Sequence, residues 1–559
     1  SIVRKAVPAC RHPNRDMAIS LGTRSRPCDG RLLDLDASID LVQERASDAL
    51  LAAAGVSFET VADREFLASG DTALVTVTVT NHGDSVAILN DVTVSGAVRV
   101  RMTDAVTVPP HGTVAITRSV VNLAYAHPWW IWKTKGNFYP MVITALDGAP
   151  RAGPPLKDWT AAGIVIPETM RRPSDVTATI TVGGTSVSAS VGTIAFRSAD
   201  PVLGVRNRDV SGVPIVTLGF ERALEWAQAG KPLKNQLRIA IKSFSDKPQT
   251  FALKAHLAQG VRFDSMPASM SLAPHEAREL RAQLRGMASQ GRYEVGVQGI
   301  AGSDTLVAGF RTAQYSYLPP VHLFRDATIR LQVVNVEIPS KLSVAYVRGV
   351  GEDADIALKQ LGIPVYALNN EGLLRFDLEG ISTLMIGPDA LRADPGLLSQ
   401  AGRFTEFARK GGTVVVMSNP QAVTMPGILP FPLGYATPYF ERVATEDAPV
   451  TPLELRARVL TWPNVIRDDD WSNWSGERAS SVPTTADSRY ARVVEMHDPG
   501  EKQNRNSILI AAVGKGRFVY VSLNLQRQIA NGVPGAMRLF INLLSAGLPA
   551  ESGVAADSP

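Results

Sequence analysis

Four polar residues in the last third of the chain could together perform acyl transfer. Ser418 follows the apolar run TVVVM, and His497 lies in the segment EMHDPGEK, beside Glu495 and Asp498. A serine hydroxyl becomes a nucleophile when a histidine takes its proton and a carboxylate orients that histidine. Ser418 lacks the flanking glycines of a G-x-S-x-G elbow. We therefore prefer the alternative interpretation, a strand terminus and a loop histidine, and predict no catalytic residue.

Two further motifs are similar to ligand-binding loops. Gly349-Val350-Gly351 follows an apolar run, and glycines there would let backbone amides approach a phosphate. The acidic residues that follow within 352–355 would repel a phosphate, so no nucleotide and no other cofactor is predicted. Asp468-Asp469-Asp470 with Glu477 could bind calcium. Their spacing fits no EF-hand loop, and a solvated acidic loop is the preferred interpretation.

The histidines and cysteines do not suggest a metal site. Cys10 and Cys28 are the only cysteines, too few for a disulfide framework or a four-cysteine zinc site. A catalytic zinc needs three protein ligands and an open position for water. His12 and His127 begin the only His-Pro pairs, and neither pair is followed by paired acids. We predict no metal ligand in this chain.

Tryptophans gather in two short segments. Trp129, Trp130 and Trp132 lie within four residues of one another, and Trp471 and Trp474 lie near Trp462. Exposed aromatic rings stack on sugars and bind protein partners. Two interpretations stay open: a ligand contact with a glycan or a protein, or packing at a seam between domains. We prefer the seam.

Length and charge limit the classes of protein. A chain of 559 residues is long enough for three or four domains. The formal net charge is +4 and no block of five or six like charges occurs, which argues against a dedicated nucleic-acid binder. No apolar run is long enough to span a membrane, and the opening SIVRKAVPAC is not a signal peptide.

Alternating patterns predict two all-β sandwiches in the first two thirds of the chain. The run ALVTVTVTN at 73–81 places valines on one face and threonines on the other, and Asn81-His82-Gly83-Asp84 supplies a turn. The same plan recurs from NQLRIAIKSFS to GRYEVGVQGIAG, which indicates a second sandwich that Tyr317-Leu318-Pro319-Pro320 closes as a linker. Short linkers around 205–213 and 319–340 predict a semi-rigid rod with an aromatic-rich seam.

After residue 340 the pattern changes to strands that alternate with helices. KLSVAYVRG, IPVYALN, STLMIGPDA and TVVVMSN are apolar strands, and SILIAAVGKGRFVYVSLN is a hairpin turning at Gly514-Lys515-Gly516. Such alternation predicts a parallel α/β sheet of flavodoxin-like type. The expected domains are a helical or irregular segment, a sandwich, a sandwich plus linker, an α/β domain and a disordered tail, at 1–54, 55–212, 213–338, 339–549 and 550–559.

The order of several sequence segments resembles that in the C-terminal half of large bacterial PIG-L (LmbE-like) deacetylases. The similarity rests on KLSVAYVRGVGEDADIALKQLGIPVYAL, TLMIGPDALRADPGLL, FARKGGTVVVMSN, PGILPFPL, VGKGRFVYVSLNLQRQIANGVPGAMRLFINLL, HPWWIWKTKGNFYP and ADPVLGVRNRDV. The family joins a zinc N-deacetylase domain to immunoglobulin-like sandwiches and a class I glutamine-amidotransferase-like domain. The resemblance covers about 50–548, and the family's Ala-His-Pro-Asp-Asp-Glu zinc motif is absent.

The resemblance implies a non-catalytic accessory region that binds substrate or partner for a deacetylase acting on an N-acetylated sugar or glycoconjugate. It implies an upstream deacetylase domain as partner, zinc only in that domain, a glycan as a further partner and an extracytoplasmic location. The α/β domain would be an inactive amidotransferase-like scaffold, since no cysteine follows Cys28. The alternative is a stand-alone structural or carbohydrate- or protein-binding module. In either case we expect the chain alone to be inactive.

Overall fold

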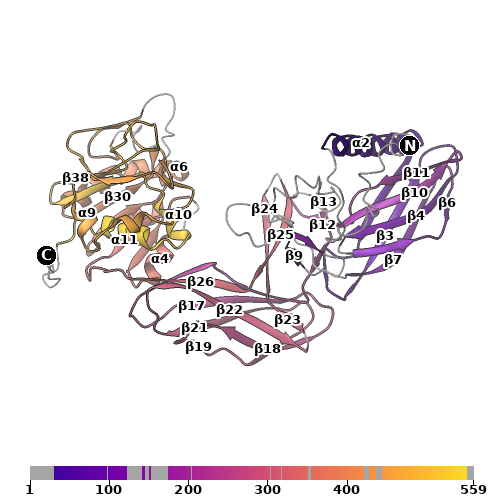
Figure 1. Cartoon of the computed structure of the whole chain (residues 1–559), viewed down its shortest axis with the longest axis horizontal. Helices are drawn as coiled ribbons and strands as arrows, with labels where there is room; N and C mark the ends of the chain where they lie inside the picture. Colours follow the sequence, from indigo (N-terminus) through magenta and orange to yellow (C-terminus); the bar gives the residue numbers. More distant parts are fainter. Residues whose placement is uncertain are drawn as a thin grey trace.

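The computed structural model describes eleven stretches of the chain. They are residues 30–96, 98–122, 142–144, 150–152, 174–202, 204–302, 304–315, 318–350, 354–420, 427–435 and 444–549. Figure 1 shows two β-rich domains followed by an α/β domain, with the first β domain and the α/β domain at opposite ends of the second. The outline is bent, so the predicted rod is wrong in shape.

The first β-sandwich is one continuous sheet that folds over at β5. Among the described residues ten strands join it, in the order β11-β10-β4-β5-β7-β3-β1-β12-β13, with β6 beside β4. The short strand β5 pairs with β4 on one side and β7 on the other, which links the two halves. The valines of the alternating run on β3 are buried against β4 and β10. Outside this sheet, β2 pairs with β14 and β8 with β9. The strands of the domain are β1 (Val56–Ala62), β2 (Phe66–Ala68), β3 (Thr72–Asn81), β4 (Ala87–Gly96), β5 (Val98–Met102), β6 (Val106–Val108), β7 (Thr113–Asn122), β8 (Val142–Thr144), β9 (Pro150–Ala152), β10 (Ser174–Val182), β11 (Thr185–Ser190), β12 (Ala195–Asp200), β13 (Gly204–Asp209) and β14 (Ser211–Val213).

A helix precedes this sandwich, as the sequence predicts. Helix α2 (Gly30–Ala53) lies against β11 and β1, and Leu51 near its end is buried in the sandwich core (Figure 1). Gly55 has a φ of +71°, and its amide donates a hydrogen bond to the Ala52 carbonyl. Glycine adopts this left-handed conformation without steric cost, which explains why the helix stops there.

The second β-sandwich packs two separate sheets. One has the order β15-β17-β21-β19, and the other β16-β26-β22-β18-β20 with β23 beside β22. The two β-sandwiches that the alternating patterns predict are therefore confirmed. The strands are β15 (Val216–Phe220), β16 (Leu224–Gln228), β17 (Gln236–Ser243), β18 (Gln249–His256), β19 (Val261–Asp264), β20 (Ser269–Leu272), β21 (Ala277–Gly286), β22 (Gly291–Ala301), β23 (Asp304–Leu306), β24 (Ala308–Tyr315), β25 (Leu318–Asp326) and β26 (Thr328–Val334).

One side-chain contact recurs in both sandwiches. His111 Nε2 lies 2.9 Å from Asp84 Oδ1 in the first, and His275 Nε2 lies 2.9 Å from Asp246 Oδ1 in the second. Each histidine has a positive φ, and each aspartate lies in the turn after an alternating strand. The equivalent contacts support the internal repeat that the sequence suggested.

The expected linkers are strands instead. Leu318–Asp326 pairs with Ala308–Tyr315 as the hairpin β24–β25, and β26 inserts between β16 and β22 of the second sandwich. Residues 205–213 form most of β13 and all of β14. The linker predictions are therefore wrong: Pro319 and Pro320 lie within β25, an edge strand, where proline is tolerated.

The junction of the two sandwiches is aromatic, as predicted, but it is built from phenylalanines. Phe66 of β2 lies 5.6 Å from Phe244 and 5.4 Å from Phe310, measured between ring centroids. Beside them, Arg64 Nη1 of the first sandwich lies 2.7 Å from Asp246 Oδ2 of the second. Each edge-to-face aromatic pair contributes about 0.5–1.5 kcal/mol beyond the stabilisation from the area that it buries. This cluster therefore stabilises the junction.

The third domain is a parallel sheet with one antiparallel edge. Within the described residues its order is β28-β27-β29-β30-β39-β38-β36, and the first five strands run parallel. The strands and helices expected after residue 340 are present, including the hairpin at Gly514-Lys515-Gly516. The sheet strands are β27 (Val344–Val347), β28 (Val365–Leu368), β29 (Thr383–Ile386), β30 (Thr413–Met417), β36 (Ala491–Arg492), β38 (Ile508–Val513) and β39 (Gly516–Val521).

Two apolar cores cover the two faces of this sheet. Alternate residues of each central strand point to opposite sides: Tyr346 joins one core and Val347 the other. The first core includes α4 and α11, and the second includes α7. The helices are α4 (Ala354–Gln360), α5 (Asn370–Arg375), α6 (Ala390–Ala393), η4 (Pro395–Gln400), α7 (Ala401–Arg409), α9 (Arg458–Thr461), η5 (Asp468–Trp471), α10 (Leu525–Ala530) and α11 (Pro534–Leu544); the short strands of the insertion are β31 (Leu433–Gly434), β32 (Ala444–Thr445), β33 (Val450–Pro452), β34 (Glu477–Ala479), β35 (Thr485–Ala486) and β37 (Val494–Met496).

Candidate binding site

Ser418 lies at the carboxyl end of β30 in a constrained turn. Its φ is +36°, it is 8% exposed, and its amide donates to the Val521 carbonyl. The next residue, Asn419, is fully buried and hydrogen-bonds to Gly387 and Leu391, which fixes the neighbouring loop to the strand end. Ser418 thus has a positive φ, which residues other than glycine rarely adopt.

The proposed partners of Ser418 are engaged elsewhere. Asp498 Oδ1 accepts hydrogen bonds from the amide and hydroxyl of Thr445, and Glu495 Oε2 accepts one from Arg505. Across the described residues no hydrogen bond joins Ser418 to His497 or to either acid, and His497 Nδ1 is buried without a partner. The arrangement therefore lacks the base–nucleophile contact of an acyl-transfer site.

The glycine turn after β27 has a packing role. A Cβ on Gly349 would lie 2.0 Å from the Pro388 carbonyl oxygen, so only glycine fits against this loop. In the adjacent helix α4, Asp355 is fully buried and accepts hydrogen bonds from Arg348 and Lys359. Burial opposes the charge of this carboxylate, but the two hydrogen bonds hold its pKa below the ordinary value.

The tryptophans of the insertion belong to a core. Trp471 and Trp474 are 8% and 6% exposed, their ring centroids lie 5.3 Å apart, and Trp474 Nε1 donates to the Asp470 carbonyl. No open ring face is left for a sugar. They share this core with Trp226, which comes from the second sandwich. Trp129, Trp130 and Trp132 lie outside the described residues, as do Cys10, Cys28, His12 and His127.

The acidic segment is only partly solvated. Asp468 and Asp469 are exposed as expected, whereas Asp470 is 9% exposed and its Oδ2 accepts from the Arg467 amide. Within the described stretches no three His, Cys, Asp or Glu side chains gather closely enough to hold a metal ion. No helix in the same stretches is long and apolar enough to cross a membrane.

The second sandwich meets the α/β domain at a buried seam. Trp226 of β16 is 1% exposed, and its amide donates to Gln360 Oε1 of α4 at 2.9 Å. Next to it, Arg330 Nη1 of β26 donates to the Asn531 carbonyl at 2.7 Å. An edge strand of one domain and a helix of the other are thus held together by apolar packing and directed hydrogen bonds.

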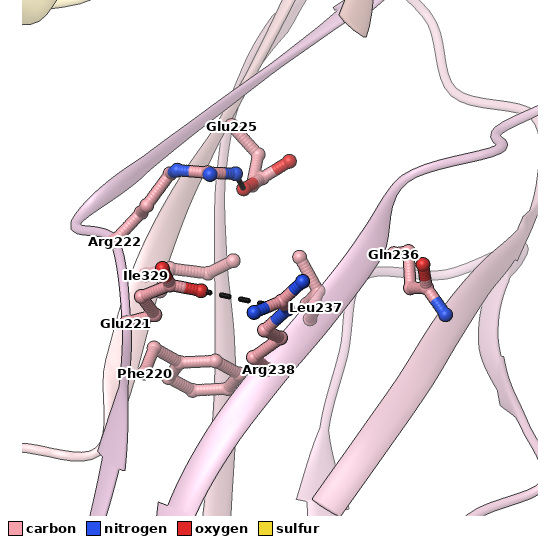
Figure 2. Close-up of a pocket in the computed structure, with 8 residues that line it drawn as sticks. All are labelled: Phe220, Glu221, Arg222, Glu225, Gln236, Leu237, Arg238 and Ile329. Carbon is pink, nitrogen blue, oxygen red and sulfur yellow. Dashed lines mark ion pairs between the residues drawn. The ribbon is translucent and has the colours of Figure 1, made fainter. Parts of the chain in front are cut away.

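A pocket opens beside this seam, where the chain crosses from one sheet to the other. Strand β15 belongs to the first sheet and β16 to the second, and residues 221–223 connect them. The Glu221 amide donates to the Arg238 carbonyl and the Arg330 amide to the Ala223 carbonyl, so the connection is fixed to both sheets. We call the cavity at this connection, of about 160 Å³, the crossover pocket; it is lined by Phe220, Glu221, Arg222, Glu225, Gln236, Leu237, Arg238 and Ile329 (Figure 2).

Two loose ion pairs lie side by side in the crossover pocket (Figure 2). Arg222 Nη1 lies 3.9 Å from Glu225 Oε1, and Arg238 Nε lies 3.8 Å from Glu221 Oε2. Both separations exceed hydrogen-bond length. Glu221 and Arg238 are about half exposed, whereas Glu225 is only 3% exposed.

Glu225 connects the pocket to the seam. Its Oε2 accepts hydrogen bonds from Asn235 Nδ2 at 2.9 Å and from Gln360 Nε2 of the α/β domain at 2.7 Å. Burial raises the pKa of this carboxyl, and the hydrogen bond from Asn235 and the charge of Arg222 only partly oppose the rise. A ligand that contacts Oε1 would therefore act on a group that already joins the two domains.

The sequence did not point to this pocket. Glu225 interrupts the apolar strand LEWAQ, and an acidic residue between Leu224 and Trp226 is the signal that could have marked it. Gln236 and Arg238 are simply the polar positions of an alternating strand. Their approach to Glu225 depends on pairing between β15 and β17, which no local pattern reveals.

Comparisons with known proteins are uninformative about function. No family model matches the chain, and no curated protein matches it. Among solved structures, it is similar to red sea bream transglutaminase at 12% identity and a TM-score of 0.21, over 50% of this chain and 31% of that one. A Rahnella sp. R3 β-galactosidase has 17% identity and a TM-score of 0.22, over 38% and 32%. A Salmonella alpha-2-macroglobulin has 10% identity and a TM-score of 0.17, over 50% and 16%. The chain therefore spans less than a third of each of these proteins, and similarities this low assign neither a fold family nor a function.

Proposed function

We propose that the chain is the non-catalytic accessory region of a PIG-L-type zinc N-deacetylase that acts on an N-acetylated sugar or glycoconjugate. In this proposal the sandwiches are immunoglobulin-like, and the third domain is a flavodoxin-like, class I amidotransferase-like scaffold. Its parallel strands, numbered along the chain, lie in the order 2-1-3-4-5, which supports that class. The deacetylase domain is the proposed partner, and zinc belongs to that domain.

The observation that carries the proposal is the pair of buried seams at the two ends of the second sandwich. Phe66 packs on Phe244 and Phe310 at one end, and Trp226 hydrogen-bonds to Gln360 at the other. An accessory region positions a substrate or a neighbouring domain, and it can do so only if its own parts keep fixed relative positions. Buried aromatic packing with directed hydrogen bonds provides that constraint.

A second candidate function is a stand-alone carbohydrate- or protein-binding module. The crossover pocket favours it, since a pocket of charged and aromatic side chains in the second sandwich can bind a ligand without a linked enzyme. The two candidates differ in whether a deacetylase domain recognises this chain.

The test mixes the purified chain with a purified PIG-L-type deacetylase domain and follows acetate release from chitotetraose. We expect the chain alone to release no acetate, and to lower the KM of the deacetylase domain while leaving kcat unchanged, because accessory binding concentrates substrate without altering chemistry. A matched control adds the chain carrying Trp226→Ala, which should lower the KM less. Acetate release by the chain alone would refute the proposal, and an unchanged KM without complex formation would favour the stand-alone module.

A further inference from the structure

We propose that the crossover pocket binds one neutral sugar ring of a glycan. The pocket carries two guanidinium groups, from Arg222 and Arg238, and two carboxyl groups, from Glu221 and Glu225. Because these charges balance, a free anion would meet two carboxylates and a free cation would meet two guanidinium groups. A neutral ligand with many hydroxyl groups meets no such repulsion.

The hydrogen-bonding capacity of the pocket is largely unused. Neither guanidinium donates a hydrogen bond to any of the described residues, and their nearest carboxylate oxygens lie 3.8 and 3.9 Å away. Glu225 Oε1 likewise accepts none from this part of the chain. A sugar hydroxyl both donates and accepts, so adjacent hydroxyls can bridge a guanidinium and a carboxylate that are too far apart to bond directly. Such bonds to charged groups are stronger than those between neutral groups.

The size of the pocket and its single aromatic ring fit one pyranose ring. A cavity of about 160 Å³ is smaller than the roughly 300–1,000 Å³ that holds a drug-sized ligand. Phe220 adds a partly buried aromatic ring beside Glu221 and Arg238, whereas Leu237 and Ile329 lie beneath the charged groups and are each only 3% exposed (Figure 2). One C–H face of a sugar ring can pack on the Phe220 ring while the hydroxyls reach the charged side chains. The open mouth leaves room for the rest of a glycan outside.

The glycan-binding site of the proposed accessory region would then lie in the second sandwich. The proposal rests on the proposed function only for the N-acetylated identity of the sugar. Since Glu225 also accepts a hydrogen bond from Gln360, a bound sugar would stiffen the seam with the α/β domain. Sugar binding should therefore slow hydrogen exchange at the Trp226 amide, which donates to the same glutamine.

The experiment measures binding of three tetrasaccharide probes to the whole chain by titration calorimetry: chitotetraose, cellotetraose and the anionic tetragalacturonate. We expect at least one neutral probe to bind at millimolar concentration or below, and more tightly than tetragalacturonate. Arg238→Ala should weaken that binding at least about tenfold, because it removes a charged donor. The Arg238 side chain is half exposed and makes no hydrogen bond within the described residues, so the variant should fold.

Arg262→Ala is the matched control, because Arg262 is an exposed arginine on strand β19 of the same sheet and does not line the pocket. Its loss should leave binding unchanged, whereas Arg222→Ala should repeat the effect of Arg238→Ala. The inference is overturned if neither neutral probe binds, if tetragalacturonate binds best, or if Arg238→Ala and Arg262→Ala behave alike. Binding of cellotetraose alone would support the pocket and contradict the N-acetylated substrate of the proposed function.

Discussion

Replacing Trp226 tests whether the second sandwich and the α/β domain are held together as one unit. Its side chain is 1% exposed and contributes to a core shared by both domains, and its indole Nε1 has no hydrogen-bond partner in the described stretches. Trp226→Ala removes the packing and the unpaired N–H together. Trp226→Phe keeps most of the packing and removes the N–H.

The structure predicts a large loss of stability for Trp226→Ala and a small change for Trp226→Phe. Full burial of a tryptophan covers about 150–250 Å², which at about 25 cal/mol per Å² corresponds to roughly 4–6 kcal/mol. Loss of an unsatisfied buried donor returns about 1–3 kcal/mol. Trp226→Ala should therefore lower the free energy of unfolding by about 3 kcal/mol. Trp226→Phe should change it by less than about 1 kcal/mol, since the smaller ring loses area but no longer buries an unpaired N–H.

Urea unfolding followed by circular dichroism measures the stability, and hydrogen exchange of peptides from β16 and α4 shows where it is lost. We expect both peptides to exchange faster in Trp226→Ala, because each forms one side of the seam. Unfolding in two separate transitions would also be expected for this variant, since weakly joined domains lose cooperativity. A loss below about 1 kcal/mol in Trp226→Ala, or an equal loss in both variants, would refute this account of the seam.

Two further substitutions test buried polar groups of the α/β domain. Asn542 is fully buried, and its side chain accepts two hydrogen bonds from Asn464 and donates to backbone carbonyls, so Asn542→Ala should cost about 3 kcal/mol in urea unfolding; a cost below about 1 kcal/mol would contradict this. Asp355→Asn should cost about 2 kcal/mol at neutral pH, because Arg348 and Lys359 lose a charged acceptor. Since the pKa of Asp355 is lowered in the folded state, its contribution is present above a pH of about 4 and is lost as the pH falls through the folded pKa. The difference between wild type and Asp355→Asn should therefore shrink on acidification, and a constant difference down to low pH would argue against the ion pairs.

The sequence predicted those elements whose pattern is local. The valines of β3 and the hairpin at Gly514-Lys515-Gly516 each follow from spacing or from one residue's conformational freedom. The alternation of apolar strands with helices after residue 340 likewise arises within short windows. These features need no knowledge of distant partners.

What the sequence left open or missed depends on contacts between distant segments. Strand β26 belongs to the second sandwich because it pairs in parallel with β16, about a hundred residues earlier. Trp471 and Trp474 are buried because α11 and the short η5 turn pack together, and composition alone cannot distinguish a buried aromatic from an exposed one. The crossover pocket forms only when β15, β16 and β17 are placed in two sheets. No sequence motif therefore predicts it.

One proton NMR experiment tests most directly whether this chain binds a glycan without deacetylating it. The sample contains the 559-residue chain, chitotetraose and added zinc. Saturation transfer to the sugar-ring protons reports binding, and the methyl signal of free acetate reports deacetylation in the same sample. We expect saturation transfer that Arg238→Ala reduces, with no acetate above the protein-free sample. Acetate that accumulates in proportion to the protein and disappears with a chelator would contradict the proposed function, and the absence of any saturation transfer would contradict the sugar site.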